Sequence, residues 1–147
     1  MSDRIEKDVF IAAPVERVWR ALTDHEQFGA WFGVKLDGPF IVGESTYGAM
    51  TEPSFEGWPW ESRTEVMEAP RLFAFTWAHT VERDEDPHTA PRTRVEFRLA
   101  PEGEGTRLTI VESGFDAVPE ERRAEVMRNN ARGWEIQSAR VKDHAER

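Results

Sequence analysis

Apolar and polar residues alternate near the start of the chain, where Ile5, Val9 and Ile11 share one side of the extended segment 4–12. A period of two is typical of a strand with one buried face. The same pattern predicts strands over 34–47, 60–67, 72–77, 93–99 and 106–111. The first of these is broken by the turn-forming residues 37–39, and short turns separate the others, so we expect an antiparallel meander.

Three segments have helical spacing instead. A short helix is predicted after Pro14, and a second one is capped by Thr23 and Asp24 and ends at Gly33. A long helix is predicted from Pro119, with an apolar stripe that recurs every three or four residues. The members of this stripe are Met127, Ala131, Trp134, Ser138, Val141 and Ala145.

This order of elements predicts an α+β fold in which the long helix covers one face of a curved antiparallel sheet. Most side chains in the stripe are medium or small, and Ser138 places a hydroxyl where Leu would normally pack. Two explanations are open. Either the helix packs closely on the aromatic side chains of the strands, or the small side chains leave a cavity. If they leave a cavity, Ser138→Leu should raise stability and weaken ligand binding.

Composition narrows the class of protein. A chain of 147 residues suits one domain, 1–147. Its 28 acidic against 19 basic residues give a net charge of −9, which disfavours nucleic acid as a partner. The sequence has neither an apolar run long enough to span a membrane nor the apolar core of a signal peptide, so we expect no membrane insertion and a cytoplasmic location. The absence of cysteine excludes disulfides and thiol chemistry.

The polar residues carry few motifs of known chemistry. The four histidines, His25, His79, His88 and His144, lack the spacing of paired metal ligands, so no metal site is predicted. There is no glycine-rich phosphate-binding motif and no Gly-x-Ser-x-Gly motif, so neither a cofactor nor nucleotide hydrolysis is indicated. The acidic segment 81–92 is interpreted as a solvated hairpin loop or, alternatively, as a lid.

Glu112 is an acidic residue in phase with an apolar strand face, that of Leu108 and Ile110. If the strand keeps its register, the carboxylate points inward as a ligand anchor or as a general acid whose pKa is raised by desolvation. If the register ends at Gly114, the side chain reaches solvent or pairs with an arginine at the rim.

The stretch FEGWPWE, residues 55–61, holds two of the six tryptophans between turn-forming residues. Trp60 begins a predicted strand and is expected on the concave side of the sheet. Trp58, between Gly57 and Pro59, is expected either to cover the edge of a cavity or to pack on a neighbouring loop or a second subunit.

Several segments resemble the SRPBCC superfamily: IAAPVERVWRALTDHEQFGAWFG at 11–33, EAPRLFAFTW at 68–77, GTRLTIVESGFD at 105–116, and Gly133-Trp134. Within it they are similar to the branch related to the C-terminal domain of the heat-shock-protein-90 ATPase activator. The resemblance runs from the first predicted strand to about residue 141. It implies the helix-grip (START-like) fold, with six to seven strands around a long C-terminal helix and a ligand cavity between them. Two departures, Ser138 for an apolar residue and Glu112 where many relatives carry His, would make the cavity wall more polar.

The superfamily includes lipid carriers, hormone binders and polyketide cyclases, so the resemblance implies a fold rather than one activity. We expect a protein that binds a small hydrophobic molecule, aromatic or lipid-like, without a cofactor. The alternatives are a cyclase- or hydrolase-like enzyme that uses Glu112, and a protein-interaction (co-chaperone-like) module that could form a homodimer. The candidate ligand-binding residues are Trp31, Phe32, Tyr47, Trp60, Phe73, Phe75, Trp77, Phe97, Glu112, Phe115, Trp134 and Ser138. Several of them are expected to belong to the core.

Overall fold

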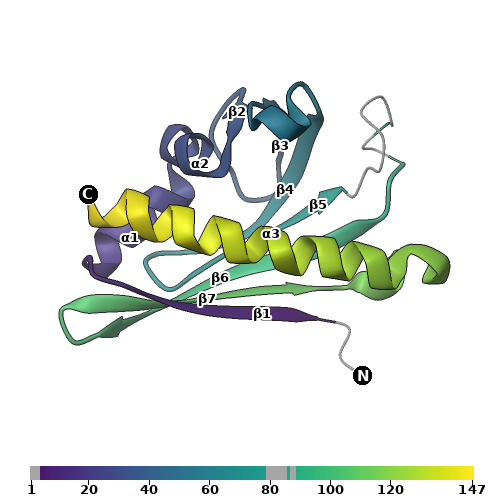
Figure 1. Cartoon of the computed structure of the whole chain (residues 1–147). Helices are drawn as coiled ribbons and strands as arrows, with labels where there is room; N and C mark the ends of the chain where they lie inside the picture. Colours follow the sequence, from purple (N-terminus) through teal and green to yellow (C-terminus); the bar gives the residue numbers. More distant parts are fainter. Residues whose placement is uncertain (1–3, 79–85, 87–88) are drawn as a thin grey trace.

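The computed structural model describes residues 4–78, 86 and 89–147, and over these residues it forms one seven-stranded antiparallel sheet and three α-helices (Figure 1). The strands are β1 (Ile5–Ile11), β2 (Val34–Leu36), β3 (Ser45–Met50), β4 (Pro59–Glu68), β5 (Leu72–Ala78), β6 (Arg92–Glu102) and β7 (Gly105–Ser113). The helices are α1 (Val15–Thr23), α2 (His25–Phe32) and α3 (Glu120–Glu146), with short 3₁₀ turns η1 (Pro53–Phe55) and η2 (Phe115–Ala117). The predicted helix-grip fold is confirmed.

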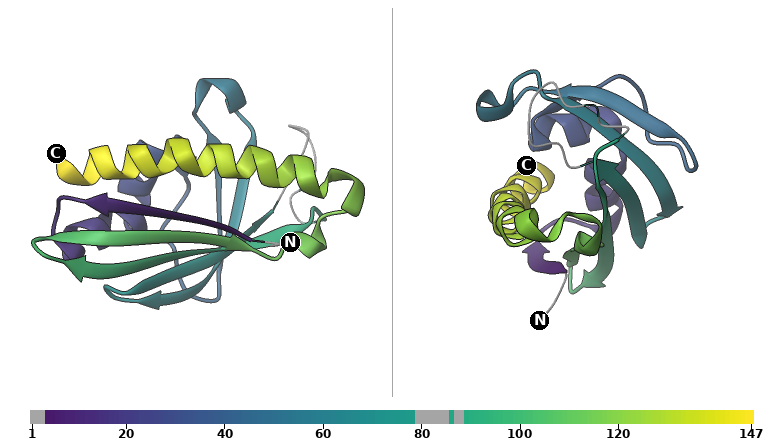
Figure 2. Two further views of the ribbon diagram at one scale, coloured as in Figure 1. Left: turned by 60° about the horizontal axis from the view of Figure 1, so that its bottom comes forward. Right: turned by 90° about the vertical axis from the view of Figure 1, so that its right-hand side faces the viewer.

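The sheet order is β1-β7-β6-β5-β4-β3-β2, so the two strands that α1 and α2 connect lie at opposite edges. The segment that contains α1 and α2 must therefore cross the whole sheet, and it does so at one end of the concave face (Figure 1). In the right-hand view of Figure 2, the sheet curves around α3, which is seen nearly end-on. The β1–β7 pairing, with Ile5 opposite Glu112, joins the first strand to the last strand of the sheet in chain order.

Local sequence signals account for the ends of α2. The side chain of Asp24 accepts hydrogen bonds from the backbone N–H groups of Glu26 (2.9 Å) and Gln27 (3.3 Å), which caps the helix. Gly33 ends it in the left-handed conformation, with φ of 93°. Thr23 was predicted to share the cap, but it lies in the last turn of α1, where its hydroxyl donates to the carbonyl of Trp19.

Two strand predictions needed correction. The segment 34–47 was predicted to continue as a strand after the break at 37–39, but β3 begins only at Ser45. Residues 41–44 instead form a turn in which Gly43 has a φ of 86° and donates to the carbonyl of Thr64 (2.8 Å). The loop predicted at 101–105 is shorter than expected, because β6 and β7 continue pairing as far as Glu102 and Gly105.

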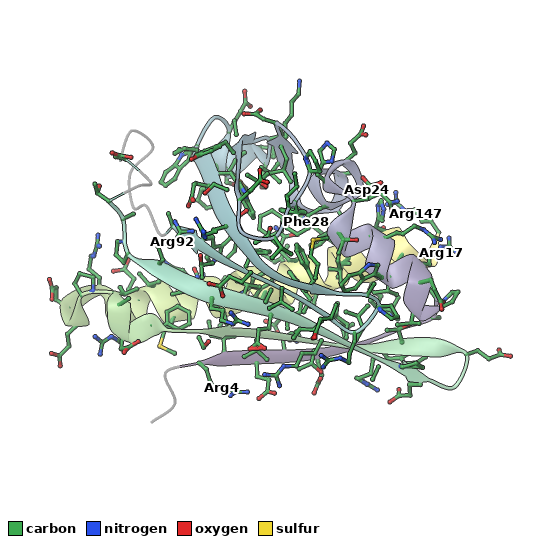
Figure 3. All side chains as sticks on the ribbon, turned by 180° about the vertical axis from the view of Figure 1, so that it is seen from behind. Arg4, Arg17, Asp24, Phe28, Arg92 and Arg147 are labelled. Atoms are coloured by element: carbon green, nitrogen blue, oxygen red, sulfur yellow. The ribbon has the colours of Figure 1, made fainter. Side chains whose placement is uncertain are left out.

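The interior is built from aromatic rings. Phe28 of α2, labelled in Figure 3, is fully buried and stacks on Phe32 at 5.0 Å between centroids. It also meets Trp60 and Phe75 of the sheet edge-to-face, at 5.7 and 6.4 Å. Offset and edge-to-face contacts of this kind stabilise aromatic clusters beyond the area they bury. They fix α2 against the middle of the sheet.

The outer face of the sheet carries a buried carboxylate, that of Glu61. The side chain of Glu61, only 4% exposed, pairs with Arg92, which is labelled in Figure 3, and accepts a hydrogen bond from the hydroxyl of Ser45 (3.2 Å). Tyr47 lies opposite Glu61 in the β3–β4 register and shares this outer face. The face that holds Tyr47 is therefore the one turned away from α3.

The stripe predicted for the long helix is only partly buried. Trp134, Ser138, Val141 and Ala145 are buried, whereas Met127 is half-buried and Ala131 is exposed. The reason is the position of α3, which packs on β1, α1 and α2 toward its C-terminus and on η2 near its N-terminus. Between these two contacts one side of the helix faces open space.

Candidate functional site

A groove of about 860 Å³ lies between α3 and the segment that runs from β3 through η1 into β4. One wall consists of α3 residues, and the opposite wall is formed by Met50, Phe55 and Trp58. Phe32 of α2 and Trp77 of β5 also line it. A groove of this size with mostly apolar and aromatic walls is the common form of a small-molecule site.

The wall opposite α3 is a tight loop. Gly57 has a φ of 83° and donates to the carbonyl of Met50 (2.9 Å), while the N–H of Trp58 bonds to the carbonyl of Phe55 (2.9 Å). The rings of Phe55 and Trp58 meet edge-to-face at 5.5 Å. Trp58 is half-buried and lines the groove, which agrees with its expected place at the edge of a cavity, and its ring packs on its own loop rather than on a neighbouring one. Trp60 is instead a core residue, 5% exposed.

Two tryptophans from distant segments meet at the base of the groove. Trp77 and Trp134 stack with 5.6 Å between ring centroids and 25° between planes. Phe32 contacts both rings, at 6.0 and 6.3 Å. Together these three side chains, all predicted as site residues, give the groove a rigid aromatic base.

Glu112 holds the two indoles in place. The prediction that its side chain points inward is confirmed, since it is 0% exposed and pairs with Val95 inside the sheet. It accepts hydrogen bonds from the indole N–H groups of Trp77 and Trp134, each at 2.9 Å. The alternative in which the carboxylate reaches solvent is wrong.

Two further donors serve the same carboxylate. The hydroxyl of Thr93 donates at 2.6 Å, and the amide of Asn130 lies 3.1 Å from both carboxylate oxygens. A buried carboxylate is tolerated only when such donors replace its lost hydration. Because these donors come from β5, β6 and α3, Glu112 ties the base of the groove to the helix.

The other predicted site residues lie away from the groove. Six are core residues between 0% and 5% exposed: Trp31, Trp60, Phe73, Phe75, Phe97 and Phe115. Tyr47 is 44% exposed on the outer face of the sheet, since it is out of phase with the buried Thr46. Ser138 is 3% exposed and donates to the carbonyl of Glu135 (3.0 Å) within α3. Its hydroxyl is satisfied by its own helix and does not face the groove.

Several groove residues were not among the candidate ligand-binding residues chosen from the sequence. Gly133 sits in the middle of α3 and lines the groove, and a Cβ added there would meet no atom within 4 Å. A glycine inside a helix is unfavourable by about 1 kcal/mol relative to alanine, and that was the signal available in the sequence. Met50, Phe55, Asn130, Ile136 and Arg140 also line the groove and had no such signal.

A second cavity of about 450 Å³ adjoins the first at the C-terminal end of α3. The two share Glu52 and Arg140 in their walls. His144 lines the second cavity and lies 3.2 Å from the amide oxygen of Gln27. His79, His88 and most of the loop predicted at 81–92 lie outside the described residues.

No group of three His, Asp or Glu side chains within 4–78, 86 and 89–147 is placed to hold a metal ion. In the same part of the chain, no helix is both long enough and apolar enough to cross a membrane.

The family model for Activator of Hsp90 ATPase homolog 1-like proteins matches residues 12–146. The chain belongs to this family. The resemblance to the SRPBCC superfamily and to its activator-related branch is thereby confirmed. A search of curated proteins found no match to the sequence.

Solved structures share the fold. Protein BH1534 of Bacillus halodurans is 29% identical with a TM-score of 0.72, over 97% of this chain and 96% of that one. DynU16, from the dynemicin biosynthetic locus, is 24% identical with a TM-score of 0.76, and the match covers 99% of this chain but only 48% of DynU16. The Aha1 dimer of Colwellia psychrerythraea is 17% identical with a TM-score of 0.74, over 99% and 97% of the two chains.

Proposed function

We propose that this protein binds a small hydrophobic molecule, aromatic or lipid-like, in the groove between α3 and the loop that holds Trp58. The observation that carries the proposal is the groove itself, about 860 Å³, with the stacked Trp77 and Trp134 at its base. Aromatic walls supply large apolar contact areas with little loss of side-chain freedom. Membership of a family that shares the helix-grip fold supports a ligand-binding role.

In this proposal Glu112 is a positioning residue. Its carboxylate is fully buried and is not part of the groove wall, whereas two of its donors, Trp77 and Trp134, are. Its role is to hold the indole planes in one orientation, which lowers the ordering cost of binding. The cyclase- or hydrolase-like alternative would require the carboxylate to leave these donors and reach the ligand.

Gly133 offers a direct test, because its missing side chain is part of the space that a ligand would occupy. Gly133→Leu should project a side chain into the groove and abolish binding of aromatic ligands. Leu is a better helix former than Gly by about 1 kcal/mol, and a thermal melt of the variant separates loss of binding from unfolding. Ala139→Leu is the matched control, since it adds the same side chain to the exposed side of the same helix.

The measurement has two parts. Native mass spectrometry of the purified protein should detect a retained small molecule, and tryptophan fluorescence should respond to a panel of aromatic and fatty compounds. Both signals should disappear in Gly133→Leu and persist in Ala139→Leu. A panel that leaves the fluorescence unchanged, or a response that Gly133→Leu retains, contradicts the proposal.

A homodimer is a second candidate, favoured by two exposed apolar side chains beside the groove. Phe55 is 48% exposed and Ile136 is 50% exposed, on opposite walls. Apolar residues exposed in this way often mark an interface. Light scattering should then give twice the monomer mass for the wild type and the monomer mass for Ile136→Arg. A monomeric wild type at high concentration contradicts this candidate.

A further inference from the structure

The described residues that line the groove differ in net charge from the protein as a whole. The whole chain carries −9, whereas this part of the lining holds three arginines, Arg122, Arg132 and Arg140, and two glutamates, Glu52 and Glu125. All three arginines belong to α3. The walls therefore favour a negatively charged guest that the remaining surface of the protein would repel.

The guanidinium groups of these three arginines are free of other partners in the described part of the chain and can bind an anion. Among the residues the structure describes, Arg122, Arg132 and Arg140 form no ion pair or side-chain hydrogen bond. Arg147, at the far end of the second cavity, is instead paired with Asp143 at 2.7 Å. A guanidinium without an internal partner keeps its donors for a planar anion such as a carboxylate or sulfonate.

Arg140 is the best placed of the three. It is half-buried and lines both cavities, whereas Arg132 is exposed. It lies seven residues, or about 10 Å of helix rise, beyond Gly133. A molecule whose apolar body lies against Gly133 and Trp134 would bring an acidic end to Arg140.

The negative charge of Glu52 opposes the binding of an anion at Arg140, and this opposition can be tested. It faces the same junction of the two cavities, and within the described residues one of its buried carboxylate oxygens has no hydrogen-bond partner. Its charge must weaken the binding of any anion at Arg140. Removing the two charges one at a time should therefore have opposite effects on the affinity for an anion.

We propose that the groove selects an amphipathic acid, with its apolar or aromatic body against Gly133 and Trp134 and its anionic group bound by Arg140. This inference rests on the proposed function, because it specifies the ligand class of the same groove. It assigns Arg140 as the residue that determines specificity for charge.

The experiment uses two fluorescent probes with the same ring system. Anilinonaphthalene sulfonate carries an anionic group, and N-phenylnaphthylamine is its uncharged counterpart. Both are titrated against the wild type, Arg140→Gln, Glu52→Gln and Gly133→Leu. Arg128→Gln is the matched control, because Arg128 is exposed on α3 and lines neither cavity. A thermal melt of each variant confirms that it is folded.

Arg140→Gln should weaken sulfonate binding about tenfold or more, the effect of losing one charge-assisted hydrogen bond, and should change binding of the neutral probe by less than about twofold. Glu52→Gln should strengthen sulfonate binding, and Arg128→Gln should change neither. If Gly133→Leu abolishes both probes while Arg140→Gln affects neither, or affects both equally, the groove is the site but selection for an acid is refuted. If neither probe binds the wild type, or Gly133→Leu leaves binding intact, both proposals fail.

Discussion

Two parts of α3, its C-terminal part and its middle, have small side chains in different surroundings. Toward the C-terminus, Ser138, Val141 and Ala145 are at most 3% exposed against packed neighbours. In the middle of the helix, Gly133 faces a groove and has no atom within 4 Å of where its Cβ would lie. A small side chain on a helix therefore leaves open space only where the neighbouring element does not pack against it.

The difference follows from what each part of the helix faces. The C-terminal part packs directly on α1, α2 and β1, and polar bonds reinforce that contact. Lys142 donates to the carbonyl of Phe10 (2.9 Å), and the carboxylate of Glu146 accepts from the N–H of Ala12 (2.8 Å). The middle part faces the η1 loop across the groove.

The largest effect is expected at Glu112, which joins the middle of α3 to the sheet. Glu112→Leu leaves the indole, hydroxyl and amide donors around it without their acceptor, at a cost of about 3 kcal/mol or more in the free energy of unfolding. Glu112→Gln keeps one acceptor oxygen and the side-chain shape, so it should cost less. Chemical denaturation measures both. Equal stability of Glu112→Leu and wild type would refute the role assigned to this carboxylate.

Ser138→Leu comes next and tests the closed end of the helix. The sequence alone predicted that this change would stabilise the protein. Because Ser138 is buried and lines neither cavity, we now expect overpacking that costs about 1–3 kcal/mol. Thermal and denaturant unfolding should show the loss. An increase in stability would mean that spare volume lies beneath Ser138 after all.

Gly133→Ala should have the opposite sign at the open part of the same helix. Alanine lowers the backbone entropy of the unfolded chain, and its methyl group meets no neighbour, so we expect stability to rise by about 0.5–1 kcal/mol. Comparing its melting temperature with that of the wild type is sufficient. A fall in stability would show that the groove wall is packed at this position.

The smallest effect is expected at Glu146, where the helix is tied to the β1–α1 junction. The hydrogen bond from Lys142, followed by that from the Ala12 N–H, lowers the pKa of Glu146 below its ordinary value of 4.5. A lowered pKa in the folded state stabilises the protein above the ordinary pKa, and this contribution is lost as the pH falls through the folded value. Glu146→Gln should therefore lower the melting temperature slightly at pH near 7 and no longer do so in strong acid. A pH-independent difference contradicts this account.

Much of the fold could be predicted because its signals are local. Alternation gave the strands, and Asp24 and Gly33 marked the ends of α2, since caps and left-handed glycines act within one turn of the chain. The inward direction of Glu112 was also predictable, because side chains in a strand alternate between two faces. The resemblance to a known superfamily added the helix-grip arrangement as a whole.

The groove was decided by tertiary structure. The indole donors to Glu112 come from positions 35 and 22 residues away, and no local pattern pairs them. Tyr47 and Ser138 looked like cavity residues, but one faces outward and the other faces packed side chains. The periodicity of apolar residues predicts which side of a strand or helix is buried, but it does not predict the distance from that side to the neighbouring element. That distance depends on the position of η1, and it places Gly133, rather than Ser138, in the wall of the groove.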